Sequence, residues 1–148
     1  MTDIIFVCAW NTCRSAMAQY IMQHLLDTAG LADKIHVDSA GCITEGGEPL
    51  GRRTRQTLLD NGISVSAHVS KSFTTQHYQT FDRVIALDKG VLRLLKKNFD
   101  GDPDDKISLL TGDDGKPLSV EDPGYKGEHA KAYAEILRGC QVLLNEIA

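Results

Sequence analysis

The sequence has few cysteines and aromatic residues and contains no long apolar run. Only four of its 148 residues are cysteine, and 6% are aromatic. Four cysteines are few for a disulfide scaffold, and no cysteine–histidine spacing typical of a metal site is present. No apolar stretch approaches the roughly 18 residues that a membrane helix needs. We therefore expect a protein of the reducing cytoplasm, with no membrane span, no metal and no cofactor.

An excess of positive charge is also missing. The chain has 16 Lys and Arg against 20 Asp and Glu, a formal net charge of −4, and no basic cluster stands out. This balance argues against a nucleic-acid surface. The N-terminus has no basic segment leading into an apolar signal core, so we expect no signal peptide. Because 42% of the residues are hydrophobic and no repeat or linker is evident, residues 1–148 are expected to form one domain.

Apolar residues recur at strand spacing and at helix spacing in alternation along the chain. Strands are predicted at 3–7, 34–41, 81–88 and 106–110, and helices at 15–31, 51–63, 89–99 and 128–147. Such alternation is typical of a doubly wound α/β fold. We expect a four-stranded parallel sheet with helices on both faces, a three-layer α/β/α architecture. Ligands in such sheets bind at the C-terminal ends of the strands.

The first strand-to-helix loop carries the strongest chemical signal. It reads VCAWNTCRS from Val7 to Ser15. A helix N-terminus offers unpaired N–H groups and a positive dipole to an anion, and Arg14 can grip two oxygens of a phosphate. The same positive field is expected to lower the pKa of Cys8, which makes it a candidate nucleophile toward phosphorus.

A plainer interpretation of this loop is that Cys8 is a buried core cysteine and Arg14 a surface residue. A cysteine and an arginine six positions apart are a short pattern that occurs by chance. The match lies after a predicted strand and before a predicted helix, and this context favours the functional interpretation.

An ester leaving group needs a proton, and Asp122 in the sequence VEDPGYKG is our candidate for the acid. It lies in a Pro/Gly loop just before the last predicted helix, from which it can reach the site. The alternative is that Asp-Pro-Gly is only a turn. In that case Asp113, Asp114 or Glu121 is the next candidate.

Together, the loop and the aspartate resemble the low-molecular-weight protein tyrosine phosphatase family. That family's loop has the form C-x-G-N-x-C-R-S, and residues 8–15 match it everywhere except Trp10. DSAG at 38–41, His68, FDRVIALD at 81–88 and Asp122-Pro123 follow in the family's order. The resemblance covers nearly the whole chain.

The resemblance implies a role for each matched residue. Cys8 would form a phosphocysteine, Arg14 would hold the phosphate oxygens, and Asp122 would protonate the leaving group and then activate water. Ser15 would hydrogen-bond to the Cys8 sulfur. Asn11, Ser39 and His68 would brace the loop, although Ser39 and His68 alone would be an ordinary capping serine and a surface histidine. The expected substrate contacts are Ala9, Trp10, Asn11, Thr12, Cys13, Ser15 and Tyr125. The substrate would be a phosphotyrosine protein or a small aryl phosphate, and the enzyme a monomer or weak homodimer.

Several departures from the family pattern concern the substrate pocket. Leu50-Gly51 stands where the family usually has an Asp, and residues 43–49 lack the usual aromatic. Trp10 either replaces that aromatic wall and faces Tyr125 across the slot, or folds away over apolar surface. If its φ is negative, the position does not need glycine.

Cys13 adds a redox possibility to the loop. It lies five residues from Cys8 and could capture an oxidised Cys8 as a disulfide, or could be a packed core residue. The role of Cys42 is open.

Two other functions remain open at this point. A thiol-dependent arsenate reductase shares this loop and fold but needs extra cysteines in a mobile segment, and none lies between Cys42 and Cys140. A catalytically inactive phosphate-binding module is the second alternative, which the combination of Cys8, Arg14 and Asp122 disfavours.

Overall fold

A parallel β-sheet of four strands forms the centre of the molecule in a computed structural model, which describes residues 1–124 and 127–148. The strands are β1 (Thr2–Cys8), β2 (Ile35–Gly41), β3 (Arg83–Ala86) and β4 (Ile107–Leu109). Their order is β2-β1-β3-β4, and every neighbouring pair is parallel. In the sheet, β2 lies on one side of β1 and β3 lies on the other. The loop after β1 therefore lies at the point where the strand order reverses.

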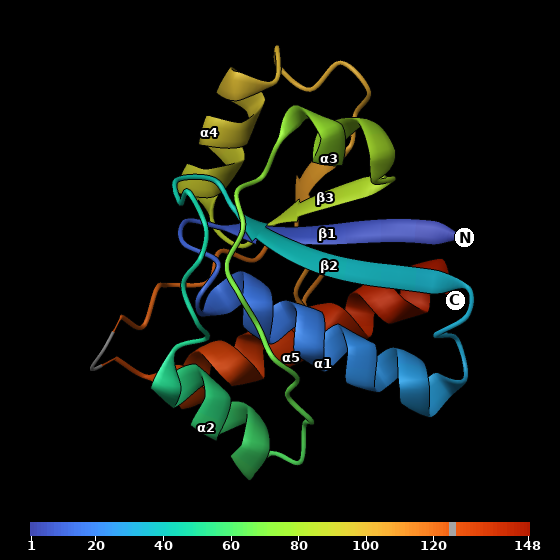
Figure 1. Cartoon of the computed structure of the whole chain (residues 1–148). Helices are drawn as coiled ribbons and strands as arrows, with labels where there is room; N and C mark the ends of the chain where they lie inside the picture. The colour runs from blue at the N-terminus through green and yellow to red at the C-terminus, as the bar shows by residue number, and fades with distance from the viewer. Residues whose placement is uncertain (125–126) are drawn as a thin grey trace.

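Five helices cover the sheet in the described part of the chain. They are α1 (Arg14–Ala29), α2 (Arg52–Asp60), α3 (Thr75–Thr80), α4 (Lys89–Asn98) and α5 (His129–Ile147). Figure 1 shows α1, α2 and α5 on one face of the sheet and α3 and α4 on the other. The predicted doubly wound, three-layer architecture is confirmed. No helix among the described residues is long and apolar enough to cross a membrane.

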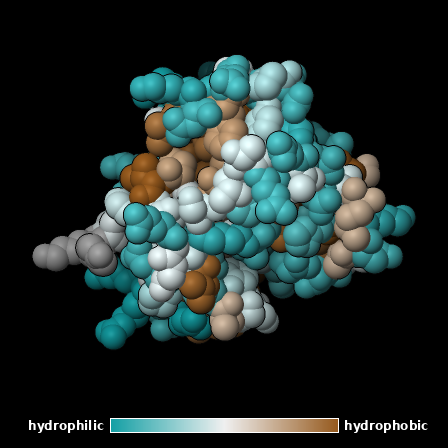
Figure 2. All heavy atoms as spheres, turned by 45° about the horizontal axis from the view of Figure 1, so that its top comes forward, coloured by the Kyte–Doolittle hydropathy of each residue, from teal (hydrophilic) through white to brown (hydrophobic). Residues whose placement is uncertain are grey.

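The alternation of side chains along β1 divides the core into two. Ile4, Phe6 and Cys8 point into the cluster that contains α1 and α5 residues. Ile5 and Val7 point into the cluster on the α4 face. Because successive strand residues face opposite sides of a sheet, Cys8 ends β1 on the α1 side. Polar side chains dominate the molecular face seen in Figure 2, where hydrophobic side chains form small patches between them.

The predicted elements correspond closely to the observed ones, with one omission. Gly30 ends α1 in a left-handed conformation, φ 71°, as its glycine predicted. The short helix α3 was missed because its six residues show no apolar period. Its signal is the N-cap Thr74, whose side chain pairs with the backbone of His77 while the His77 ring accepts from the Thr74 N–H.

Candidate active site

Cys8 lies buried at the C-terminal end of β1, where the chain turns into a tight loop that leads into α1. Its Sγ is 3.0 Å from Ser15 Oγ, and the Asn11 N–H donates to it at 3.4 Å. The N-cap residue of α1 is Cys13, and no side chain caps this helix. The first-turn N–H groups are therefore left for an anion bound above the loop.

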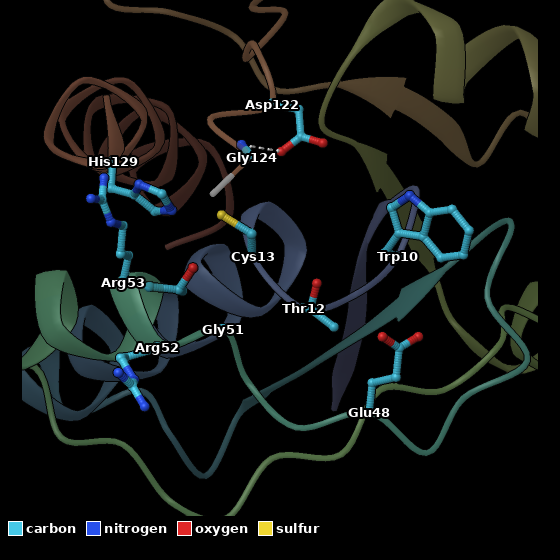
Figure 3. A pocket seen from close by; sticks show the side chains of 11 residues that line it. Trp10, Thr12, Cys13, Glu48, Gly51, Arg52, Arg53, Asp122, Gly124 and His129 are labelled. Atoms are coloured by element: carbon cyan, nitrogen blue, oxygen red, sulfur yellow. Dashed lines mark hydrogen bonds between the residues drawn. The ribbon is translucent and has the colours of Figure 1, made fainter. Parts of the chain in front are cut away.

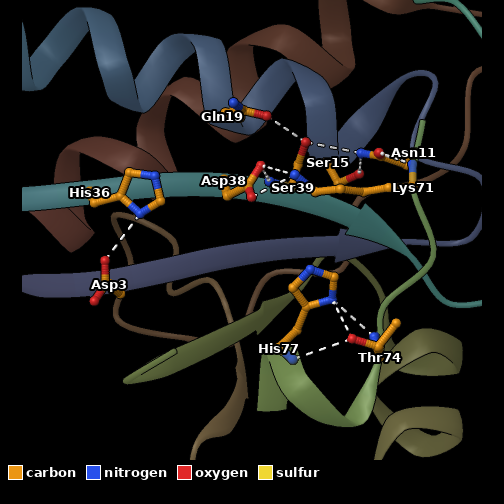
Figure 4. Close-up of polar contacts among 10 residues, drawn as sticks. All are labelled: Asp3, Asn11, Ser15, Gln19, His36, Asp38, Ser39, Lys71, Thr74 and His77. Carbon is orange, nitrogen blue, oxygen red and sulfur yellow. Dashed lines mark hydrogen bonds and ion pairs between the residues drawn. The ribbon is translucent and has the colours of Figure 1, made fainter. Parts of the chain in front are cut away.

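Asn11 fixes the shape of the loop. It is fully buried and adopts a left-handed conformation, φ 59°. Its side-chain amide donates to Ser15 Oγ at 2.9 Å and Ser39 Oγ at 3.0 Å, and its Oδ1 accepts from the Lys71 N–H at 3.1 Å (Figure 4). His68 Nε2 lies 2.7 Å from the Asn11 carbonyl oxygen and donates to it. Through these bonds, α1, β2 and the segment 68–71 hold Asn11 in its unfavourable left-handed conformation.

Neighbouring carbonyl groups also anchor the loop. The Ala9 carbonyl accepts from the Ile43 N–H at 3.0 Å, and the Thr12 carbonyl accepts from the Gly51 N–H at 3.0 Å. Both bonds turn carbonyl oxygens outward, away from an anion in the loop. The segment after β2 and the segment before α2 thus hold the outer edge of the loop.

Trp10 occupies the position of the family's glycine without needing glycine's freedom. The positive φ of the loop belongs to Asn11, and Trp10 is not among the residues with positive φ. The Trp10 side chain is 49% exposed and lines the cavity beside the loop (Figure 3). It therefore stands at the rim of the cavity instead of covering a closed apolar surface.

Arg14 is buried, and three groups hold its guanidinium. Nη1 donates to the Asp88 carboxylate and, at 3.0 Å, to the Val120 carbonyl, while Nη2 lies 3.9 Å from Asp122 Oδ2. Burial alone would lower the pKa of Arg14. The negative charges of Cys8, Asp88 and Asp122 outweigh this effect and raise its pKa above the ordinary value. Arg14 is thus a permanent cation next to Cys8.

Asp122 lies in the segment before α5, near the Arg14 guanidinium, with its side chain about half exposed. Its Oδ1 accepts from the Gly124 N–H at 3.0 Å, as in an Asx turn. The same carboxylate lines the cavity next to Cys13. The turn interpretation and the functional interpretation are therefore both compatible with its geometry.

A cavity of about 620 Å³ opens beside the loop. Figure 3 shows Trp10 and Glu48 at one end and Arg53 and His129 at the other. Its lining residues are Trp10, Thr12, Cys13, Glu48, Gly51, Arg52, Arg53, Thr54, Asp122, Gly124 and His129. Cys8 and Arg14 are not among them, so the cavity lies beside the loop and not directly above the Cys8 sulfur.

All four cysteines are free thiols. Burial, together with the charge of Cys8, raises the pKa of Cys13 to about 11, although a hydrogen bond from Thr54 acts in the opposite direction. Burial and the Cys8 charge also raise the pKa of Cys42 to about 11. A pKa this high keeps both thiols protonated at neutral pH.

Three residues of this network were missed by the sequence reasoning. Asp88 caps α4 through the Val91 N–H at 2.7 Å and also binds Arg14. Its signal was an aspartate between a strand and a helix, at the sheet edge where the loop lies. Lys71 bonds Asn11 through its backbone and Asp38 through its Nζ, and Gln19 accepts from Ser39. Lys71 and Gln19 have no sequence signal. Lys71 contacts Asn11 through its main chain, and Gln19 lies in the interior of α1.

Three more site residues were named from the sequence, namely Ser39, His68 and Tyr125. Tyr125 lies outside the described residues. Among the residues that the structure describes, no three His, Cys, Asp or Glu side chains are grouped as a metal site would need. Ser39 and His68 both lie against the loop, as the resemblance implied, and both contact Asn11.

Comparison with known proteins gives a consistent result over almost the entire chain. The profile of the family described as low molecular weight phosphotyrosine protein phosphatase matches residues 3–148. The enzyme of that name from Gallus gallus is 33% identical over 150 residues, 97% of this chain and 94% of the relative. The crystal structure of YfkJ from Bacillus subtilis superposes with a TM-score of 0.93 at 32% identity, over 99% of this chain and 94% of the other.

A second similar structure has a different named substrate. The YwlE arginine phosphatase of Bacillus subtilis, in a cysteine-to-serine mutant with a phosphorylated active site serine, superposes with a TM-score of 0.84. It is 26% identical and covers 99% of this chain and 95% of the other.

Proposed function

Because the chain belongs to the low molecular weight phosphotyrosine protein phosphatase family, we propose that it hydrolyses phosphotyrosine and other aryl phosphate monoesters through a phosphocysteine on Cys8. The observation that carries this proposal is the position of Cys8 Sγ, 3.0 Å from Ser15 Oγ and at the N-terminus of α1 beside the buried Arg14. A nucleophile, an anion seat and a fixed cation thus meet at one point.

The reaction proceeds in two displacements in this proposal. The Cys8 sulfur attacks phosphorus, the bond to the phenolic oxygen breaks, and Asp122 gives its proton to that oxygen. Water then attacks the phosphocysteine, Asp122 takes the proton, and the sulfur–phosphorus bond breaks. Ser15 donates to the departing sulfur in this second step.

The other residues of the loop hold the phosphoryl oxygens. The backbone N–H groups of the loop other than that of Asn11, including those of Thr12 and Cys13, surround the phosphate together with the guanidinium of Arg14. Asn11, Ser39 and His68 keep the loop in this shape. Asp88 acts as a positioning residue, because it binds the Arg14 guanidinium through Nη1.

The test uses p-nitrophenyl phosphate and a phosphotyrosine peptide, with and without orthovanadate. The wild-type protein should hydrolyse both, and orthovanadate should inhibit. Cys8→Ser should lose turnover, and mass spectrometry should detect a phosphoserine at position 8 after incubation with substrate. The phosphorylated serine in the YwlE mutant supports this choice of trap. Normal turnover by Cys8→Ser would contradict the covalent mechanism.

The same assays separate the alternatives. A phosphate-binding module would bind orthovanadate or phosphate but hydrolyse neither substrate. An arsenate reductase would consume a thiol reductant when arsenate is added, whereas the phosphatase would not.

Phosphoarginine is a second candidate substrate. The YwlE relative is an arginine phosphatase, and the carboxylate of Glu48 lies in the cavity at the Trp10 end, where it could pair with a guanidinium (Figure 3). If phosphoarginine is the better substrate, kcat/KM should be higher for it than for phosphotyrosine, and Glu48→Gln should remove that preference.

We also propose that residues 1–148 act as one catalytic domain in the cytoplasm, as a monomer or weak homodimer, without binding nucleic acid or membrane. The four free thiols support a reducing compartment, and the net charge of −4 supports the absence of a nucleic-acid surface. Light scattering and fractionation of cells would test these statements.

A further inference from the structure

The cavity is larger than one aryl phosphate group requires. Its volume of about 620 Å³ falls within the range of roughly 300–1,000 Å³ found for pockets that take whole drug-sized ligands. It contacts the loop through Trp10, Thr12 and Cys13 and extends away from Cys8 toward α2 and α5. Space therefore exists for a part of the substrate other than the phosphoryl group under attack.

The α2 and α5 end of this space is positively charged. Arg52 and Arg53 form the first two residues of α2, and His129 begins α5. Figure 3 shows Arg53 and His129 at this end of the cavity, with Arg52 below them. Neither arginine has an ion pair among the described residues. In a chain of net charge −4, two adjacent arginines without carboxylate partners are a local excess of positive charge.

The N-terminus of α2 adds to this field. Its N-cap is Gly51, which provides no side chain to cap the helix, and its first turn has no acidic residue. The positive end of the helix dipole and the open N–H groups thus remain uncompensated beside the cavity.

His129 supplies a third polar group, and it is more than nine-tenths buried. Its Nδ1 lies 3.2 Å from the Gly127 carbonyl oxygen. Because a carbonyl only accepts, Nδ1 carries a proton, and Nε2 is the ring nitrogen left for a ligand. Nε2 donates to an anionic group in the imidazolium form, which a nearby anion favours. No partner of Nε2 occurs within the described residues, and the ring lines the cavity.

We propose that Arg52, Arg53 and His129 form a subsite for a second anionic group on the substrate. The group is a carboxylate or a phosphoryl group on a side chain close to the phosphotyrosine. Glu48 at the opposite end repels such a group, which gives the peptide one preferred orientation in the cavity. This inference rests on the proposed phosphatase function and adds a substrate class to it.

The experiment compares three phosphotyrosine peptides of otherwise equal sequence, with glutamate, phosphoserine or glutamine beside the phosphotyrosine. The wild-type enzyme should favour the first two over the glutamine peptide by about three- to tenfold in kcat/KM. Preference for phosphoserine alone would identify a phosphoryl group as the ligand, and preference for both would identify anionic oxygen in general. Because the arginines are exposed, the preference should fall with salt.

The double variant Arg52→Gln/Arg53→Gln should bring the ratio of the three kcat/KM values close to one. Arg55→Gln is the matched control, because Arg55 is exposed on the same helix but does not line the cavity. It should keep the wild-type ratio. Melting temperatures of all variants identify any loss of folding.

Two results overturn the inference and leave the phosphatase assignment intact. In the first, the wild-type enzyme hydrolyses all three peptides equally while it turns over p-nitrophenyl phosphate. In the second, Arg55→Gln lowers the ratio as much as the double variant does, which indicates long-range charge and not a subsite. Failure to hydrolyse any of these substrates would instead reject the proposed function itself.

Discussion

Asp122 is the single residue whose proposed role has the most specific kinetic signature. Asp122→Asn should slow the hydrolysis of aryl phosphates by roughly 10²–10⁴, the usual contribution of a positioned general acid. The dependence of the rate on the pKa of the leaving group should become steeper, because the phenol must now leave unprotonated. Rates measured on a series of substituted phenyl phosphates test this.

Glu121→Gln provides the control for that measurement, since Glu121 is the neighbouring carboxylate. A wild-type rate and slope in Asp122→Asn, with a loss in Glu121→Gln, would transfer the acid role to Glu121. Because Asp122 lies 3.9 Å from Arg14, Asp122→Asn also removes a negative charge from the surroundings of the Arg14 guanidinium. The slope, which a change in phosphate binding does not alter, separates the two effects.

Trp10 is expected to act as an aromatic wall of the substrate slot. Aromatic contacts contribute about 0.5–1.5 kcal/mol beyond the area that they bury, so Trp10→Ala should lower kcat/KM for aryl phosphates roughly 2- to 10-fold. Small alkyl phosphates should lose less. Equal losses for aryl and alkyl substrates would indicate that Trp10 only shapes the loop.

At the scale of secondary structure, the end of β2 is the support on which the loop rests. Gly41 pairs with Cys8 in the sheet register, and a Cβ at Gly41 would lie 2.7 Å from the Ala9 carbonyl oxygen and 3.0 Å from the Trp10 carbonyl carbon. Both are backbone atoms, so the loop itself would have to move. A displacement of about 1 Å can cost around 10² in rate.

Gly41→Ala should therefore lower kcat/KM for p-nitrophenyl phosphate by about that factor and weaken inhibition by phosphate. Gly112→Ala is a suitable control, because its Cβ would meet the Asp114 side chain, which can rotate away. A fully active Gly41→Ala protein would show that the sheet edge does not set the geometry of the loop.

At the scale of the whole molecule, Asp102, in the segment between α4 and β4, connects α3 to β4. Its Oδ1 accepts from Tyr78 Oη at 2.7 Å and the Lys106 N–H at 2.9 Å, and its Oδ2 accepts from the Ile107 N–H at 2.9 Å. Burial would raise the pKa of Asp102, but these donors outweigh it and lower the pKa below its ordinary value. A carboxylate with a lowered pKa stabilises the fold fully above its unfolded pKa of about 3.9 and loses that contribution as the pH falls through the folded pKa.

Asp102→Asn should accordingly reduce the free energy of unfolding by about 1–3 kcal/mol at pH 7. The difference from the wild-type protein should shrink below about pH 4. Urea denaturation at pH 7, 5 and 3 measures both. Asp100→Asn, at an exposed position in the same loop, should have little effect at any pH, and a difference that grows in acid would contradict the argument.

Much of the molecule was predictable from short-range patterns. The four strands and four of the helices follow from apolar periodicity, and Cys8, Arg14 and Ser15 come together because they share one loop. Asp88 and Lys71 were not predictable, because their contacts with the site span 74 and 60 residues. The left-handed residue was also missed. The sequence comparison singled out position 10, where Trp10 stands in place of the family's glycine. The loop residue with a positive φ is instead Asn11.

The bonds of Asn11 have a consequence for the order of folding. They join residues 28, 57 and 60 positions away, and closing such long loops costs chain entropy that local contacts do not recover. A partly folded chain that has α1 but has not yet paired β1 with β2 therefore holds no phosphate. Catalytic competence is acquired late, when the 68–71 segment docks, so the recovery of activity during refolding should follow the recovery of helical signal and never precede it.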